Sequence, residues 1–163
     1  MREFVDSRES ESAVQSDFGA FYRETWDRVY RPLAVIVRDH ELAAESVDEA
    51  MVRAFQKWST VRAYDNPVGW VYRVASNYAK NRLRRRWREV PWRDVEPSWE
   101  MRTPHPEVMA AISRLPLGQR QVVVLRFVFD WSLREVGEAL DIPEGTVKSR
   151  LHRALETLKE VIE

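Results

Sequence analysis

The sequence predicts an all-α protein made of two small helical domains that are joined by a linker. Apolar residues recur at the three- and four-residue spacing of amphipathic helices through most of the 163 residues. No segment alternates convincingly between apolar and polar residues, as a half-buried strand would. Four prolines lie between residues 88 and 106 and interrupt the helical pattern there. This length leaves room for two small helical units and does not require a large catalytic cleft.

The N-terminal domain is expected to span residues 17–87, after a polar segment, residues 1–16, that is expected to form a mobile tail. A first helix begins after Ser16, its N-cap, and Pro32 is expected to kink or divide it. A second helix begins near Asp39, and a third follows the turn signal "YDNP". The polar side of this third helix carries Arg73, Asn77, Lys80, Asn81 and Arg84.

The C-terminal domain, residues 107–163, follows a linker of residues 88–106 that is rich in proline and tryptophan. The run "VVVLRFVF" has the residue types of a strand, but its helical neighbours favour a buried helix. The turn "DIPEG" joins two short amphipathic helices, which is typical of a helix-turn-helix. Asp141 in this turn tolerates a left-handed conformation better than most residues, and Pro143 suits the first turn of the following helix. The four predicted helices are residues 107–115, 118–129, 132–140 and 144–161.

Composition narrows the possible functions. The chain has no cysteine, which excludes disulfides and thiolate metal sites within it, and its three histidines show no metal-ligand spacing. The charges balance overall, but residues 66–88 hold seven bases and no acid, which suggests an anionic partner. The polar N-terminus and the lack of a long apolar segment predict a soluble, unexported protein of the cytoplasm with no membrane insertion. No cofactor is expected.

The last predicted helix has a polar face that suits DNA. Arginine and lysine can bind guanine edges or phosphates, and serine or threonine can bond to either, so an exposed helix with these residues can enter a major groove. The alternative is an ordinary solvated face, which the preceding helix and turn make less attractive. For the single histidine, a passive exposed position is an equal alternative. The residues are Thr146, Lys148, Ser149, Arg150, His152 and Arg153.

The central basic helix combines cations, amides and aromatic residues, which are the components of a surface for single-stranded nucleic acid. For Trp70 and Tyr72, a place in the core is preferred over base stacking, because Tyr72 lies on the apolar stripe. For Lys80, Asn81 and the arginines of "RLRRRWR", contact with nucleic acid is preferred over a solvated helix end.

Two long segments together resemble a bacterial sigma factor of the extracytoplasmic-function (ECF) class, the compact type that has only regions 2 and 4. "LPLGQRQVVVLRFVFDWSLREVGEALDIPEGTVKSRLHRALETL" is similar to region 4. "ELAAESVDEAMVRAFQKW" and "NPVGWVYRVASNYAKNRLRRR" resemble region 2. The resemblance covers residues 17–87 and 107–162, and finding both patterns in this order makes it specific. Gly137 departs from the family, which commonly has alanine there, at a cost of up to about 1 kcal/mol in helix propensity.

The resemblance implies a subunit of RNA polymerase that selects promoter DNA while the core enzyme performs catalysis. Asp48, Glu49 and Arg53 would contact the polymerase clamp. The residues of the last helix named above would read the −35 element. An anti-sigma protein is implied as a further partner. The residues that would recognise and open the −10 element are Tyr64, Asp65, Asn66, Asn77, Lys80, Asn81 and Arg84.

Two other classes of protein are possible from the sequence. A conventional helix-turn-helix regulator that acts without core polymerase would explain the C-terminal half, but it leaves the central basic helix unexplained. A metal-dependent nucleic-acid hydrolase would need its acidic residues to form a convergent site. These acidic residues are readily explained as helix caps and helix exterior, and no activated nucleophile can be identified. They are Asp39, Glu45, Asp48 and Glu49.

Overall fold

The computed structural model describes residues 2–89 and 105–162, and every regular element in these two ranges is helical. The predicted all-α class is confirmed. Residues 90–104, most of the predicted linker, lie outside the described residues. The helices are α1 (Arg2–Val37), α2 (His40–Gln56), α3 (Trp58–Val61), α4 (Pro67–Glu89), α5 (Pro106–Arg114), α6 (Leu117–Val123), the π-helical turn η2 (Val124–Val128), α7 (Leu133–Leu140) and α8 (Glu144–Ile162).

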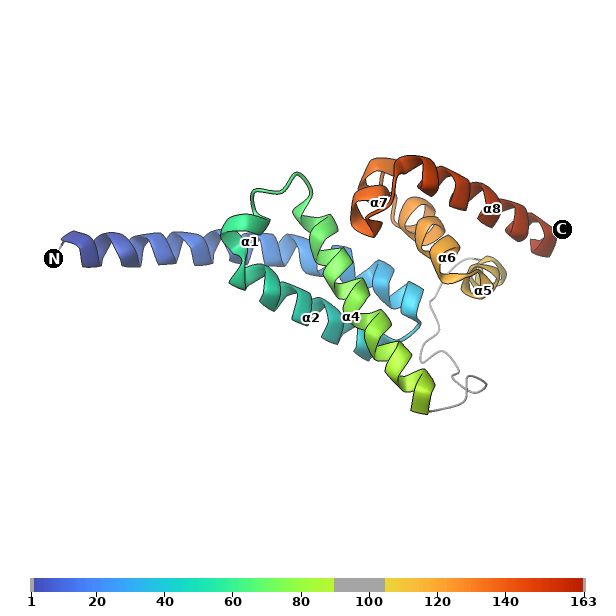
Figure 1. Ribbon diagram of the computed structural model, residues 1–163, viewed down its shortest axis with the longest axis horizontal. Helices are drawn as coiled ribbons and strands as arrows, with labels where there is room; N and C mark the ends of the chain where they lie inside the picture. Colours follow the sequence, from blue (N-terminus) through green and yellow to red (C-terminus); the bar gives the residue numbers. More distant parts are fainter. Residues whose placement is uncertain (1, 90–104, 163) are drawn as a thin grey trace.

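In the N-terminal half, α1, α2 and α4 all pack against one another (Figure 1). Short polar residues start α2 and α4. Asp39 is the N-cap of α2, where its Oδ1 accepts a hydrogen bond from the backbone N–H of Leu42 at 2.9 Å. Asn66 does the same for α4, accepting from the N–H of Gly69 at 2.8 Å. Both side chains satisfy a backbone donor that has no partner inside the helix. The helix starts predicted near Asp39 and after "YDNP" are confirmed.

Helix α1 is longer than the sequence pattern predicts. It begins at Arg2 rather than after Ser16, and its N-terminal part extends beyond the other helices (Figure 1). Residues 2–16 are therefore helical, and whether they are mobile stays a prediction. Pro32 lies inside α1 and does not divide it. Val29 and Leu33, on either side of the proline, are fully buried, and this packing offsets the backbone hydrogen bond that proline cannot make.

The C-terminal half contains the predicted helix-turn-helix, α7 and α8. Ser132 and Glu135 form a reciprocal capping box at the start of α7. Asp141 ends the helix in the left-handed conformation, with φ 55° and ψ 46°, as predicted for this turn. Residues 122–125 are buried in α6 and η2, which confirms the helical interpretation of "VVVLRFVF". Phe127, at the end of that run, is nevertheless 55% exposed.

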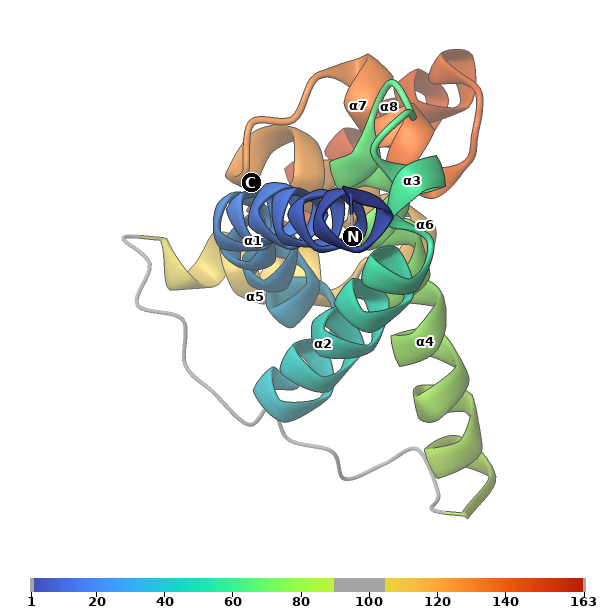
Figure 2. The same ribbon diagram turned by 90° about the vertical axis from the view of Figure 1, so that its left-hand side faces the viewer.

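The two halves pack directly against each other, with α7 on α4 and with η2 and α6 on α1 (Figures 1 and 2). Tyr72 of α4 is fully buried, and its ring meets Trp131 edge-on with 5.5 Å between centroids. The amide of Gln121, from α6, donates to the hydroxyl of Ser76 at 3.2 Å and reaches that of Tyr72 at 3.5 Å. Burial raises the pKa of Tyr72 to about 12, so its hydroxyl stays neutral at physiological pH. The place of Tyr72 in the core is confirmed.

Gly137 is required by a close approach of the backbone. A Cβ built there would lie 2.9 Å from the carbonyl oxygen of Ile142, and the Gly137 carbonyl itself accepts from the Ile142 N–H at 3.0 Å. The turn of the helix-turn-helix thus folds back onto the last turns of α7. Glycine at this position permits that contact. Helix propensity alone predicted that a glycine at position 137 would only destabilise α7.

Gly137→Ala should destabilise the protein by about 1–3 kcal/mol, because the new methyl group forces the carbonyl and the turn apart. The free energy of unfolding in urea would measure the effect. Gly145→Ala is the matched control, since nothing lies within 4 Å of a Cβ in the first turn of α8. That control should leave stability unchanged or raise it by up to about 1 kcal/mol. A neutral Gly137→Ala would contradict the close-approach argument.

Candidate nucleic-acid and polymerase interfaces

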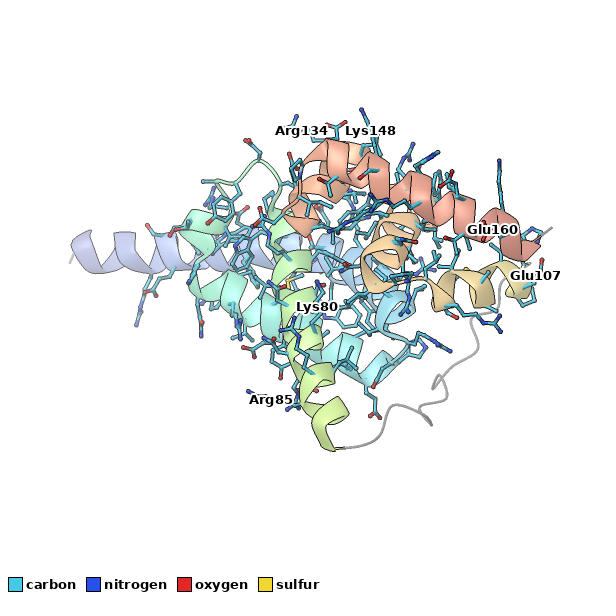
Figure 3. The ribbon with its side chains drawn as sticks, turned by 45° about the vertical axis from the view of Figure 1, so that its right-hand side comes forward. Lys80, Arg85, Glu107, Arg134, Lys148 and Glu160 are labelled. Carbon is cyan, nitrogen blue, oxygen red and sulfur yellow. The ribbon has the colours of Figure 1, made fainter. Side chains whose placement is uncertain are left out.

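The outer face of α8 presents most of the residues predicted to contact DNA. Lys148, Ser149, His152 and Arg153 are exposed, and Lys148 points away from the body of the protein (Figure 3). The buried stripe of α8, which includes Val147, Leu151 and Ala154, faces α6 and α7 and fixes the direction of the exposed face. His152 lies 3.3 Å from a carboxylate oxygen of Glu156 on the next turn. The exposed face therefore combines cations and a hydroxyl on one rigid helix.

Arg150 and Thr146 differ from their neighbours on α8. Both are only half-exposed. The guanidinium of Arg150 turns toward α6. Its Nη1 lies 3.3 Å from the position that a Cβ would take at Gly118. The hydroxyl of Ser149 donates to the carbonyl of Thr146 at 3.0 Å, although a hydroxyl can still accept another bond. Helical spacing alone placed these residues on one ridge, but the packing of α6 directs Arg150 away from it.

A hollow of about 400 Å³ lies beside the loop that precedes α4. The predicted −10 residues Tyr64, Asp65 and Asn66 line it together with Trp70 and Arg73, and Glu138 reaches into it from α7. The rings of Tyr64 and Trp70 lie 6.5 Å apart, centroid to centroid. Trp70 is thus half-exposed and lines the hollow, so the preferred place for Trp70 in the core is only partly correct. The hollow offers flat apolar faces and hydrogen-bonding groups together.

The remaining predicted −10 residues lie further along α4. Asn77, Asn81 and Arg84 are exposed, whereas Lys80 is half-buried. Burial lowers the pKa of Lys80, and the nearby positive charges of Arg84 and Arg150 lower it further. Arg82 is set apart from this group, because it pairs with Glu45 of α2 at 2.9 Å. One side of α4 therefore carries Arg82, which is paired with α2, and another side carries Lys80 and Arg84, which form a positive surface that approaches α8 at Lys80.

The predicted polymerase-contact residues occupy the outer side of α2. Asp48 is exposed and accepts from the indole N–H of Trp26 at 2.8 Å, and Glu49 pairs with Arg53 at 2.9 Å. Sequence reasoning missed Val52 and Phe55 on the same side, which are 52% and 48% exposed. Their spacing from Asp48, four and seven residues, was the available signal, because it separates them from the buried stripe of α2. This side of α2 is thus both charged and apolar.

Two further searches bear on the function. Among residues 2–89 and 105–162, no group of three or more histidine, aspartate or glutamate side chains is arranged to hold a metal ion. Within the same ranges, none of the helices combines the length and the apolar character needed to span a bilayer.

The sequence and the fold match known proteins over both halves. Residues 21–89 match the family model for Sigma-70 region 2, and residues 105–158 match the one for Sigma-70, region 4. An RNA polymerase sigma-E factor of Streptomyces avermitilis is 31% identical over 90% of this chain and 86% of that protein. The ECF RNA polymerase sigma factor SigM of Mycobacterium tuberculosis is 32% identical over 89% of this chain and 76% of that protein.

The fold is also similar to that of a solved sigma factor. The chain superposes on RpoE of Bartonella quintana, crystallised in complex with the anti-sigma factor NepR, with a TM-score of 0.71. The two sequences are 19% identical, and the match covers 90% of this chain and 96% of that one. Both regions, their order along the chain and the helix-turn-helix agree with the interpretation of the sequence. The chain belongs to the extracytoplasmic-function class of RNA polymerase sigma factors.

Proposed function

We propose that this sigma factor directs core RNA polymerase to promoters through two DNA-contacting surfaces, one on each domain. The observation that carries the proposal is a pair of surfaces on different domains. One is the basic exposed face of α8, and the other is the hollow together with the basic face of α4 beside it. A conventional regulator needs only the first. The chain supplies promoter choice, and catalysis belongs to the core enzyme.

The division of labour follows the chemistry of each surface. Lys148, Ser149 and Arg153 can reach the base edges and phosphates of a −35 major groove. Beside α4, Tyr64 and Trp70 offer flat faces for an unstacked base and Asn66 offers an amide for its edge, while Lys80 and Arg84 can follow the phosphates. His152 and Thr146 belong to the proposed −35 surface, with Arg150 at its margin. Asp65, Asn77 and Asn81 complete the proposed −10 surface.

Further parts of the proposal concern partners and organisation. The outer side of α2, with Asp48, Glu49 and Arg53, is the proposed contact with the polymerase clamp, and exposed Val52 and Phe55 would add apolar area to it. We assign residues 17–87 and 107–163 to the two domains and residues 88–106 to the linker. An anti-sigma protein is the proposed regulator, and the cytoplasm, where polymerase acts, is the proposed location.

Addition of the purified protein to a bacterial core RNA polymerase should produce new transcript starts on fragmented genomic DNA. Sequencing of the 5′ ends, with and without the protein, would measure this. The new starts should share two upstream motifs at a fixed spacing, because two domains on one chain read both. The absence of new starts, together with tight binding to duplex DNA without the core enzyme, would favour a conventional regulator instead.

Replacement of both Lys148 and Arg153 by alanine should reduce discrimination for the upstream motif by about 5- to 100-fold. This is the effect of losing one base contact, which contributes roughly 1–3 kcal/mol of discrimination, because a contact to phosphate carries no sequence information. Transcription from promoters with intact and scrambled −35 motifs would measure the ratio. Binding to core polymerase should be retained. Arg114→Ala with Lys159→Ala is the matched control, since it removes two exposed positive charges of the same domain. An equal loss of discrimination in the control would show that the effect comes from the net charge of the domain and not from contacts of Lys148 and Arg153.

Replacement of both Lys80 and Asn81 by alanine should impair promoter opening more than closed-complex formation, because these side chains face the strand that is extruded. Permanganate reactivity of unpaired thymines around the −10 motif would report opening, and a gel-shift with core polymerase would report binding. Arg82→Ala removes a charge from the same helix on the side that pairs with Glu45 and should retain reactivity. Full reactivity in the double variant would remove Lys80 and Asn81 from the proposed surface.

A further inference from the structure

Two neighbouring helices of the N-terminal domain expose one apolar strip, where α1 passes the end of α2. Phe18 of α1 packs against Phe55 of α2 with 5.1 Å between ring centroids, and Tyr22 follows Phe18 at 6.4 Å. Residues 14, 18 and 22 are each four apart, so they lie on one face of α1. Val14, Tyr22 and Phe55 are all exposed. The strip therefore continues from the outer side of α2 onto α1.

A hollow of about 250 Å³ lies beside this strip, between the start of α1 and the end of α2. Its lining residues are Ser10, Glu11, Val14, Gln15 and Phe55. Four of these five belong to the part of α1 that precedes residue 21, where the match to Sigma-70 region 2 begins. The hollow is thus built largely by a part of this chain that lies outside the family match.

The start of α1 is anchored at its base. Asp17 accepts a hydrogen bond from the indole N–H of Trp58 at 3.1 Å and pairs with Arg62 at 3.3 Å, which ties α1 to α3. From there toward the N-terminus, α1 extends past the other helices (Figures 1 and 2), and the side chains of residues 10–16 are exposed. A short polar helix is only marginally stable in water unless an apolar face is covered. The hollow beside Val14 offers such a face to a partner.

Phe55 connects the hollow to the surface proposed for the polymerase clamp. It lies three residues beyond Val52 and seven beyond Asp48, on the outer side of α2. Helix α1 follows α2 along this side, because the indole N–H of Trp26 donates to Asp48 at 2.8 Å. Acidic groups lie at both ends of the continuous surface, with Glu11 in the hollow and Asp48 on α2. A partner that covers both ends must therefore present an apolar side chain flanked by basic groups.

We propose that the start of α1 is a second polymerase-binding element, in which the hollow between Val14 and Phe55 takes an apolar side chain of the clamp. Glu11 pairs with a basic group beside that side chain. One partner then covers the outer side of α2 and the start of α1 together, as a single interface with an apolar centre and a polar rim. The proposal rests on the clamp contact proposed for Asp48 and Glu49 and adds an element to it.

A charge placed in the hollow tests the contact. Val14→Asp should weaken binding to core polymerase about tenfold, because the apolar group that enters the hollow would then meet a carboxylate. Ala13→Asp is the matched control, since it adds the same charge to the neighbouring exposed residue, which does not line the hollow. The control costs α1 more helix propensity than the test, because it replaces alanine. Fraying of α1 therefore cannot explain a selective effect of Val14→Asp.

Fluorescence anisotropy would measure binding to core polymerase. The dye is placed on a cysteine that replaces Glu160 at the far end of α8 (Figure 3), in a chain that has no cysteine of its own. Both variants should keep the wild-type free energy of unfolding in urea, because Ala13 and Val14 are exposed. Equal binding of core polymerase by Val14→Asp and Ala13→Asp would overturn the proposal.

Replacement of both Asp48 and Glu49 by alanine separates this proposal from the one on which it rests. If that double variant binds core polymerase as tightly as the wild type, the clamp contact on α2 fails, and the α1 element falls with it. If the double variant binds weakly while Val14→Asp binds normally, only the α1 element fails.

A cross-link identifies the partner that fills the hollow. Val14→Cys, labelled with benzophenone maleimide and irradiated with core polymerase, should cross-link to the clamp, and Ala13→Cys should do so less. Mass spectrometry of the cross-linked peptides would locate the contact. A cross-link to another part of the polymerase would overturn the choice of partner. A dimer of the free protein in sedimentation that Val14→Asp dissociates would overturn it as well, because a second copy would then fill the hollow.

Discussion

Gln121 is buried between the two domains, where its amide donates to Ser76 and approaches Tyr72. This contact fixes how α6 lies on α4. The position of α6 in turn fixes α8, which packs on it, and α8 packs on α7. Loss of one partner would leave a buried polar group unsatisfied, which costs more than the bond itself contributes. The interface therefore specifies one docking geometry, and the direction of the recognition helix relative to α4 follows from it.

Local structure was largely predictable because its signals lie within a few residues. The side chain of Asp39 caps α2 by accepting a hydrogen bond from a nearby backbone N–H. Asp141 adopts the left-handed conformation between α7 and α8, which aspartate tolerates better than most residues. The start of α1 was not predictable in this way. Residue 8 and residues 10–17 are exposed, so no buried stripe marks a helix there, and a polar helix has no periodicity to detect.

The candidate site was predictable as a set of residues but not as a geometry. The types and spacing of Lys148 to Arg153 indicated nucleic acid, whereas Tyr64 to Asn66 were assigned to the −10 element only by the resemblance to sigma region 2. The sequence could not show that Glu138 meets Asn66, because 72 residues separate them and the contact depends on how the domains dock. The sequence also could not show that packing of α6 against α8 turns Arg150 toward Gly118, or that Lys80 is half-buried. The value of Gly137 was also hidden, since only the turned-back chain brings the Ile142 carbonyl near it.

The interface between the two domains is only partly polar: Arg73 of α4 donates to the carbonyl of Glu138, while Tyr72 is buried against Trp131. A surface that must meet DNA cannot be largely apolar, and interfaces that form and break are more polar than permanent ones. Two arginines here donate hydrogen bonds to backbone carbonyls: Arg73 to that of Glu138, and Arg120 to those of Ile36 and Leu115. Carbonyl groups satisfy the guanidinium hydrogens but leave its net charge in place. The charge of Arg73 is instead partly offset by Asp141 at the end of α7, whose Oδ1 lies 3.9 Å from Nη1 of Arg73.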